Sequence, residues 1–216
     1  MFGYKSILRA SAYCPSTIAK DPAPNILVFL HGLGGTAETC LAQAVDFLEH
    51  SKHRNTMVVC PRGLLETGFG NSRAWYWQIK DAVIHTHQLV ASMIGIKELM
   101  DNLHTKYPAS NIMIAGFSQG GTMAVSVPIL YPDLVSHVAC FSGYIPDGIV
   151  VPASFPGKTK VFWGHGTKDA ENPYFLAERG VSDLALYDVD CYFRAASVGH
   201  TVTQEGIDAA LNWWLG

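Results

Sequence analysis

Short runs of mainly apolar residues recur along the chain and predict the strands of a sheet. They occupy residues 26–30, 56–60, 112–114, 137–142, 160–164 and 191–195. The unbroken apolar run at 26–30 is of the kind found in strands that are buried on both faces of a sheet.

Between these runs, apolar residues are spaced three and four positions apart, which predicts amphipathic helices. We expect helices over about residues 37–50, 87–104 and 173–184, a fourth directly after Ser118, and a last one that ends near Trp214. Strands that alternate with helices indicate an α/β fold, a mostly parallel sheet with helices on both faces. No linker or repeat interrupts the pattern, so we expect a single domain over residues 1–216, in which residues 1–24 form a peripheral hairpin or loop.

Capping residues and prolines predict where several helices begin and end. Thr36 is suited to cap the first helix, and Thr201 and Gln204 have the spacing of a capping box for the last one. Pro108 is expected to end the second helix, and Pro128 to kink or shorten the helix after the serine at 118.

Residues 61–87 show no clear periodicity and contain several glycine and aromatic residues. A loop of this length in a compact domain is usually functional or disordered, and its aromatic residues argue against disorder. Two interpretations stay open: the loop forms a wall of a substrate cleft, or its aromatic side chains only cover one face of the sheet.

Charge and composition exclude several classes of function. The formal net charge is −3 and the basic residues are scattered, so we expect no face for nucleic acid or anionic lipid. No stretch approaches about 18 consecutive apolar residues, and Lys5 and Arg9 interrupt the N-terminal segment, so we expect neither a membrane span nor a secretory signal. The 5 cysteines form no Cys-x-x-Cys pair and predict buried thiols in a reducing compartment, and therefore a cytoplasmic protein.

The segment Gly116-Phe117-Ser118-Gln119-Gly120 follows a predicted strand and leads into a predicted helix. Strand, tight turn and helix are the context of a G-x-S-x-G nucleophile elbow, in which a strained turn exposes the serine hydroxyl. Side chains at Gly116 and Gly120 would collide where strand and helix nearly touch. The alternative is an ordinary turn whose serine caps the helix.

Ser118, Asp169 and His200 each follow a different predicted strand, in the chain order of an α/β-hydrolase triad. Because working residues gather at the carboxyl ends of the strands in open α/β sheets, we expect these three side chains to meet. A serine needs an adjacent base, an imidazole supplies one near neutral pH, and a carboxylate orients that imidazole.

Other histidine and aspartate residues are weaker candidates for these roles. His31 and His165 precede glycine at strand ends, and we expect both to be buried and bonded to loop backbone. Asp188 and Asp190 precede the last strand and so lie at the wrong end of the sheet, while Asp183 falls in a predicted helix.

Two backbone N–H groups are candidates for an oxyanion hole, that of Gln119 and that of Leu33 in the glycine-rich turn at residues 31–35. This turn lacks the lysine and hydroxyl residue of a phosphate-binding loop, so we expect no nucleotide site. The residues expected to line the substrate cleft are Leu33, Phe69, Trp75, Trp77 and Ile145.

Five motifs resemble, in order and spacing, those of the phospholipase/carboxylesterase family, which includes acyl-protein thioesterases and small bacterial carboxylesterases. They are Leu30-His31-Gly32-Leu33-Gly34-Gly35, Gly116-Phe117-Ser118-Gln119-Gly120-Gly121, Ser142-Gly143-Tyr144-Ile145-Pro146, His165-Gly166-Thr167-Lys168-Asp169 and Gly199-His200. The first two together are far more specific than G-x-S-x-G alone. The resemblance covers the chain from about residue 25 onward. It implies an α/β-hydrolase fold, with Ser118 as nucleophile, Asp169 as acid, His200 as base and the amides of Leu33 and Gln119 as oxyanion donors.

Two departures from the family pattern flank the expected acyl cleft. Trp77 stands where the family's tryptophan–aromatic–aspartate motif, here beginning at Trp75, usually has its aspartate. Asn172-Pro173 replaces the valine–proline that commonly follows the triad acid. Both changes bear on substrate preference and leave the expected chemistry unchanged.

We therefore expect a serine carboxylesterase that cleaves short- to medium-chain carboxylic esters through an acyl-enzyme, without a cofactor or a large lid domain. No metal site is expected, because His85 and His87 have no carboxylate or cysteine beside them. The substrate is expected to be a small-molecule or lipid acyl ester, or an acylated protein. Alternatives are an acyl-protein thioesterase or lysophospholipase with the same triad, and a non-catalytic binding protein on a hydrolase scaffold. The sequence does not distinguish a monomer from a homodimer.

Overall fold

The computed structural model describes residues 8–18, 20–21, 23–78, 84–149 and 159–216. Its strands are β1 (Ala10–Tyr13), β2 (Asn25–Leu30), β3 (Thr56–Pro61), β4 (Leu65–Glu66), β5 (Arg73–Ala74), β6 (Ile112–Phe117), β7 (His137–Phe141), β8 (Lys160–Gly166) and β9 (Cys191–Ala196). Its helices are the 3-10 helix η1 (Ser16–Ile18) and the α-helices α1 (Ala37–Glu49), α2 (Thr86–Lys106), α3 (Gln119–Leu130), α4 (Phe175–Ala185) and α5 (Gln204–Leu215).

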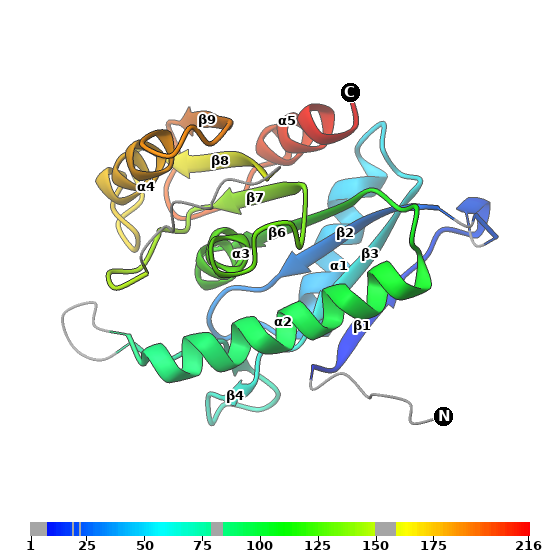
Figure 1. Ribbon diagram of the computed structural model, residues 1–216, viewed down its shortest axis with the longest axis horizontal. Helices are drawn as coiled ribbons and strands as arrows, with labels where there is room; N and C mark the ends of the chain where they lie inside the picture. Colours follow the sequence, from blue (N-terminus) through cyan, green and yellow to red (C-terminus); the bar gives the residue numbers. More distant parts are fainter. Residues whose placement is uncertain (1–7, 19, 22, 79–83, 150–158) are drawn as a thin grey trace.

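Seven strands form one sheet in the order β1-β3-β2-β6-β7-β8-β9, and β4 and β5 form a separate hairpin (Figure 1). All neighbours in the large sheet are parallel except β1, which pairs antiparallel with β3 at the edge. The predicted strands and the mostly parallel α/β architecture are confirmed. The segment at 1–24, expected as a peripheral hairpin or loop, instead contributes an edge strand, and residues 1–7 lie outside the described part.

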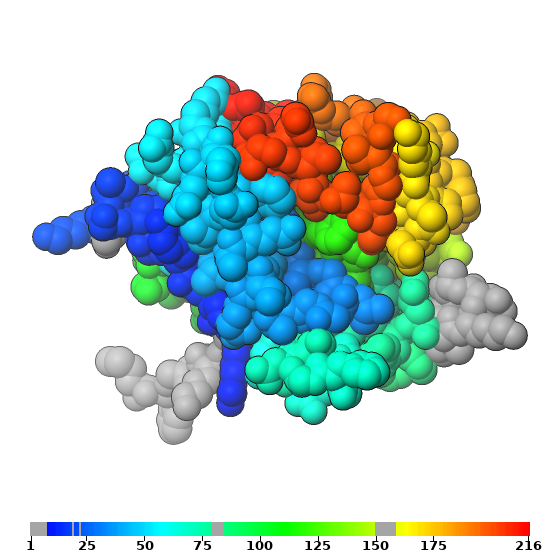
Figure 2. Space-filling model, turned by 180° about the vertical axis from the view of Figure 1, so that it is seen from behind, coloured from blue at the N-terminus to red at the C-terminus, as the bar shows by residue number. Residues whose placement is uncertain are grey.

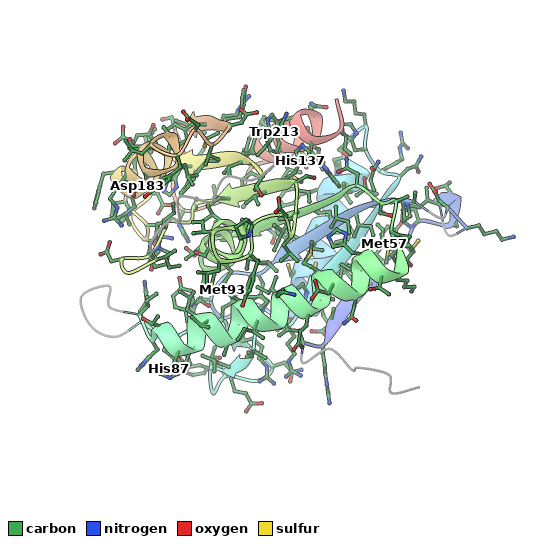
Figure 3. All side chains as sticks on the ribbon, viewed as in Figure 1. Met57, His87, Met93, His137, Asp183 and Trp213 are labelled. Carbon is green, nitrogen blue, oxygen red and sulfur yellow. The ribbon has the colours of Figure 1, made fainter. Side chains whose placement is uncertain are left out.

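Helices cover both faces of the sheet, as the alternation of strands and helices predicts. Figure 1 shows α2 and α3 in front of the strands, whereas Figure 2, from behind, shows α1 in light blue beside α5 in red. The two cores are correspondingly separate: α2, α3 and α4 pack on one face, and α1 and α5 on the other. On the first face Met93 of α2 is fully buried, and on the second the ring of Trp213 in α5 packs edge-on against His137 at the start of β7 (Figure 3).

Helix boundaries agree with the sequence at the start of α1 and the end of α2, and they differ at the end of α3 and the start of α5. Thr36 caps α1 in a capping box with Thr39, and α2 ends before Pro108. Helix α3 contains Pro128 and continues to Leu130, so of the two effects expected of this proline the early end is wrong, and the kink stays a prediction. A helix interior normally excludes proline because the ring removes one N–H donor, but the buried packing of α3 maintains the last turn here.

The cap of α5 is Thr203, whose hydroxyl accepts the backbone N–H of Gly206 at 3.1 Å. The predicted box of Thr201 and Gln204 is therefore wrong by two residues. Gln204 Nε2 instead donates to Phe47 O of α1 and to Asp208 Oδ1. These two bonds occupy the Gln204 side chain, which a capping box with Thr201 would require.

The cysteines are free, and three of them (Cys40, Cys60 and Cys140) are buried. Cys14 is exposed and Cys191 is half-buried, contrary to the expectation that all five are buried. Among the described residues, no helix has both the length and the apolar character needed to cross a bilayer.

Candidate active site

Ser118 lies in the turn between β6 and α3, in a backbone conformation that side chains rarely adopt. Its φ is 55° and its ψ is −119°. Its N–H donates to Phe141 O at 2.8 Å, and its carbonyl accepts from Thr122 N at 3.0 Å. Its side chain makes no capping bond to α3. The alternative of an ordinary helix cap is therefore excluded, and the turn has the geometry of a nucleophile elbow.

Glycines on either side of the serine permit the close approach of strand and helix. A Cβ added at Gly116 would lie 2.3 Å from Gly120 O, and one added at Gly120 would lie 2.2 Å from Leu30 O. Both contacts are with backbone, which cannot rotate away. The predicted collision is confirmed, and it extends to the end of β2.

The structure brings the three predicted side chains into one chain of hydrogen bonds. His200 Nε2 lies 2.8 Å from Ser118 Oγ, and His200 Nδ1 lies 2.8 Å from Asp169 Oδ2. The other carboxylate oxygen, Asp169 Oδ1, accepts the backbone N–H groups of Glu171 and Asn172 at 3.0 and 2.9 Å. Residues separated by up to 82 positions therefore meet at the carboxyl edge of the sheet.

The Asp169 carboxylate is held in its ionised form. Burial raises its pKa, but the hydrogen bonds from His200 and Asn172, and the charges of His200 and His165, outweigh burial and lower the pKa below the ordinary value of 3.8. A carboxylate that remains charged at neutral pH is suited to orient and stabilise an imidazolium.

The rival histidines are buried and bonded to loop backbone, as expected. His165 Nε2 donates to Asn172 O at 2.8 Å, and burial, the main cause, lowers the pKa of this imidazole. His31 Nδ1 lies 2.7 Å from Gly32 O, while its Nε2 accepts the N–H of Gly63 at 3.0 Å. Both ring nitrogens of His31 are therefore occupied, and neither ring is bonded to the serine.

The rival carboxylates lie away from the elbow. Asp190 precedes β9 and pairs with Lys160 at the start of β8, the opposite end of the sheet from Ser118. Figure 3 shows Asp183 on α4. Their positions agree with the sequence argument against them.

The two predicted oxyanion donors belong to neighbouring loops. Leu33 lies in the turn between β2 and α1, and Gln119 is the first residue of α3. Among the described residues, neither backbone N–H donates to a protein carbonyl. Both residues line the same cavity as Ser118 and His200.

The segment from Arg73 in β5 to Tyr76 connects the turn after β2 with the start of α3. The side chain of Gln119 accepts Trp75 N–H at 2.8 Å and donates to Tyr76 O at 2.8 Å. The Trp75 indole donates to His31 O at 2.9 Å and stacks on the His31 ring. Gly34 N–H donates to Arg73 O at 2.9 Å. The sequence analysis missed this role of the Gln119 side chain, because nothing in the local pattern pairs it with a loop 44 positions away.

A cavity of about 340 Å³ opens beside the serine. Of the five residues predicted to line it, Leu33 does so and is 56% exposed. Trp75 is fully buried under the His31 turn, Ile145 belongs to the core, and Phe69 is 80% exposed on the β4–β5 hairpin. Trp77 donates its N–H to Gln88 at the start of α2. These four are corrections: none belongs to the described wall of this cavity.

Their sequence neighbours line the cavity instead, namely Tyr76, Gln78 and Tyr144. Successive residues of an extended segment point to opposite sides, so a shift of one position exchanges the buried and the exposed set. The loop at 61–87 therefore contributes to the cleft wall through Tyr76 and Gln78, while Trp75 covers the core. Residues 79–83 of that loop lie outside the described part.

The geometry agrees with comparisons to known proteins. Residues 14–213 match the family model described as Phospholipase/Carboxylesterase. The chain belongs to the phospholipase/carboxylesterase family. It is accordingly an ester hydrolase with the α/β-hydrolase fold.

Two curated relatives and one solved structure illustrate the likeness. A probable carboxylesterase from Oryza sativa subsp. japonica is 30% identical over 224 residues, which cover 94% of this chain and 82% of the relative. Acyl-protein thioesterase 1 from Cryptococcus neoformans is 30% identical over 202 residues, covering 87% and 83%. The crystal structure of esterase PE8 matches with a TM-score of 0.82 at 22% identity, over 95% of this chain and 97% of that one.

Proposed function

We propose that this family member is a serine carboxylesterase that hydrolyses short- to medium-chain carboxylic esters through an acyl-enzyme. The observation that carries the proposal is the continuous hydrogen bonding from Ser118 through His200 to Asp169, with both distances 2.8 Å. With Nδ1 donating to Asp169, His200 Nε2 is left to accept the serine proton.

The reaction begins when Ser118 Oγ attacks the ester carbonyl carbon while its proton moves to His200 Nε2. The N–H groups of Leu33 and Gln119 donate to the oxyanion that forms. The tetrahedral intermediate collapses, and the alcohol departs with the proton from His200. Water, deprotonated by the same nitrogen, then attacks the acyl-enzyme and releases the carboxylic acid and free Ser118.

Labelling with a fluorophosphonate tests the nucleophile. The wild-type chain is expected to form one covalent adduct, and Ser118→Ala is expected to form none and to lose at least about a thousandfold in kcat, as triad serines do. Ser16→Ala, in η1 outside the site, is the matched control and is expected to label normally. Equal labelling of wild type and Ser118→Ala would reject the catalytic role and favour a binding protein on a hydrolase scaffold.

An acyl-protein thioesterase is the second candidate, favoured by the 30% identity to the Cryptococcus neoformans protein of that name. Comparing kcat/KM on p-nitrophenyl butyrate, a long-chain acyl thioester and a lysophospholipid separates the candidates. We expect the short ester to be preferred, since a cavity of about 340 Å³ suits a short or medium chain. A preference for the long thioester or for the lysophospholipid would replace the esterase assignment.

We also propose that the chain forms a single domain, because seven strands join one sheet. We further propose a location in the cytoplasm, because the 5 cysteines are free, as is usual in reducing compartments. Fractionation of the native host with an antibody against the chain tests the location, and recovery in a secreted fraction would contradict it.

A further inference from the structure

The cavity beside Ser118 has a polar wall. Five residues with hydrogen-bonding side chains contribute to it, namely Tyr76, Gln78, Tyr144, Glu171 and Asn172. A hydrocarbon chain placed against such groups would remove their water without offering a hydrogen-bond partner, which disfavours its binding. This wall is therefore suited to a substrate that itself forms hydrogen bonds.

Tyr76 and Tyr144 both contribute a phenol group to this wall. Burial is the main cause that raises the pKa of Tyr76 well above its usual range, so its hydroxyl stays protonated.

Tyr144 Oη accepts the Nε2 hydrogen of Gln78 at 2.7 Å. A phenol oxygen that accepts a hydrogen bond still has its own proton to donate. Tyr144 Oη forms no second hydrogen bond with the residues that the structure describes, and Tyr144 lines the cavity. Tyr144 therefore presents a hydrogen-bond donor to whatever occupies the cavity.

Acceptors are present on the same wall. Asn172 uses its Nδ2 to donate to Ser142 O at 2.7 Å, which leaves its Oδ1 available. Glu171 contributes a carboxylate at the exposed rim. A donor beside an acceptor matches a hydroxyl group, which donates and accepts at once. The rim carboxylate disfavours an anionic substituent, because like charges repel.

We propose that the cavity selects esters that carry a hydroxyl group within a few bonds of the reacting carbonyl, with Tyr144 donating to the hydroxyl oxygen and Asn172 Oδ1 accepting its proton. The inference rests on the proposed serine esterase function and specifies its substrate class. The hydroxyl has two possible sources: the acyl part, as in a hydroxyacyl ester, or the alcohol part, as in an ester of a polyol.

Two matched pairs of esters test this selection and distinguish the sources. The acyl pair is p-nitrophenyl 3-hydroxybutyrate and p-nitrophenyl butyrate, and the alcohol pair is glycerol 1-butyrate and n-propyl butyrate. In at least one pair we expect the hydroxylated ester to have a kcat/KM about 3- to 30-fold higher, the range of one or two hydrogen bonds. Ratios near one in both pairs would overturn the proposal.

The variant Tyr144→Phe is expected to bring the favoured ratio to within about twofold of one, because only the hydroxyl is lost. Tyr192→Phe, on the edge strand β9 and half exposed, is the matched control and is expected to keep the ratio. A ratio that Tyr144→Phe retains would overturn the assignment of this residue. Fluorophosphonate labelling of each variant shows that its site is formed, and it separates failure of this inference, with labelling intact, from failure of the esterase function, with labelling absent.

Discussion

Ser118 adopts a conformation that only its surroundings can maintain. A non-glycine residue at φ 55° and ψ −119° costs on the order of 1–3 kcal/mol. Backbone hydrogen bonds to Phe141 and from Thr122 fix the residue on both sides. The close approach of Gly116 and Gly120 to neighbouring backbone lets α3 start directly against β6 and β2. The position of the Ser118 hydroxyl therefore depends on residues that take no part in the reaction themselves.

The variant Gly120→Ala is expected to lose about 3 kcal/mol or more of unfolding free energy, since its Cβ would lie 2.2 Å from Leu30 O. Gly34→Ala is the control: that residue has φ +81° but nothing within 4 Å of the added Cβ, so only backbone strain of about 1 kcal/mol is expected. Urea denaturation measures both. Equal losses would show that the contact at Gly120 is relieved by a small shift.

The variant Gln119→Met is expected to lose both activity and stability while keeping the N–H proposed to bind the oxyanion, which belongs to the backbone. It leaves Trp75 N–H and Tyr76 C=O without partners in a buried site, at about 1–3 kcal/mol each. We expect kcat to fall about tenfold, because a small displacement of the donors weakens the oxyanion contact. Thermal melting and kcat on p-nitrophenyl butyrate measure the two effects.

Gln88→Met is the matched control for that variant. Gln88 bonds to the same segment through Trp77 N–H at 2.9 Å but does not reach the elbow. A smaller loss of stability with kcat within about twofold of wild type is expected. If Gln88→Met lowered kcat as much as Gln119→Met, the loss would come from increased mobility of the whole segment. It would then not come specifically from the bonds between the Gln119 side chain and Trp75 and Tyr76.

At the scale of elements, regular sequence patterns predicted where the strands and most helices lie. Competition between neighbouring side chains decided the helix start that the patterns missed. The unbroken apolar run at residues 26–30 predicted the buried strand β2, and a hydroxyl residue directly before an amphipathic pattern predicted the start of α1. The predicted start of α5 was wrong because Thr201 and Thr203 both precede the helix. Sequence spacing alone favoured Thr201, whereas Thr203 is the cap. Gln204 donates a hydrogen bond to Phe47 O of α1, and no local sequence pattern predicts this long-range contact.

The start of α5 is expected to depend on the hydroxyl of Thr203 and not on that of Thr201. Thr203→Ala removes the bond to Gly206 N–H and should cost about 1 kcal/mol of unfolding free energy. Thr201→Ala removes only a bond of 3.4 Å from an exposed hydroxyl to Val202 O and should change stability by less than about 0.5 kcal/mol. Chemical denaturation of both variants decides, and the reverse order would restore Thr201 as the cap.

At the scale of the whole molecule, chain order predicted the meeting of Ser118, Asp169 and His200, because parallel strands bring their carboxyl ends to one edge of the sheet. The cavity wall was not predictable in the same way. Whether Trp75 or Tyr76 faces the cavity is decided by hydrogen bonds to Gln119 and His31, which are distant in sequence. The local sequence shows that neighbouring side chains such as Trp75 and Tyr76 point to opposite sides, but it does not show which of the two faces the cavity.

Buried histidines make the stability of the whole chain dependent on pH. Burial lowers the pKa of His31 and of His165 below the ordinary value of 6.5, although their bonds to backbone carbonyls act in the opposite direction. Below pH 6.5 the unfolded chain therefore binds more protons than the folded one. Stability then falls as the pH falls, by at most about 1.4 kcal/mol per pH unit for each histidine. Asp169, whose pKa lies below 3.8, contributes to acid unfolding only at lower pH.

We expect the melting temperature to drop between pH 6.5 and 5, and His165→Gln to reduce that drop. A glutamine amide can still donate to Asn172 O but takes up no proton, so the term from this site disappears. The exposed His50, whose pKa is raised by its contacts with Asp46, is the control: His50→Gln should leave the slope nearly unchanged or slightly steeper. Calorimetric melting at three or four pH values measures the slopes, and identical slopes for wild type and His165→Gln would show that this imidazole is not held neutral by the fold.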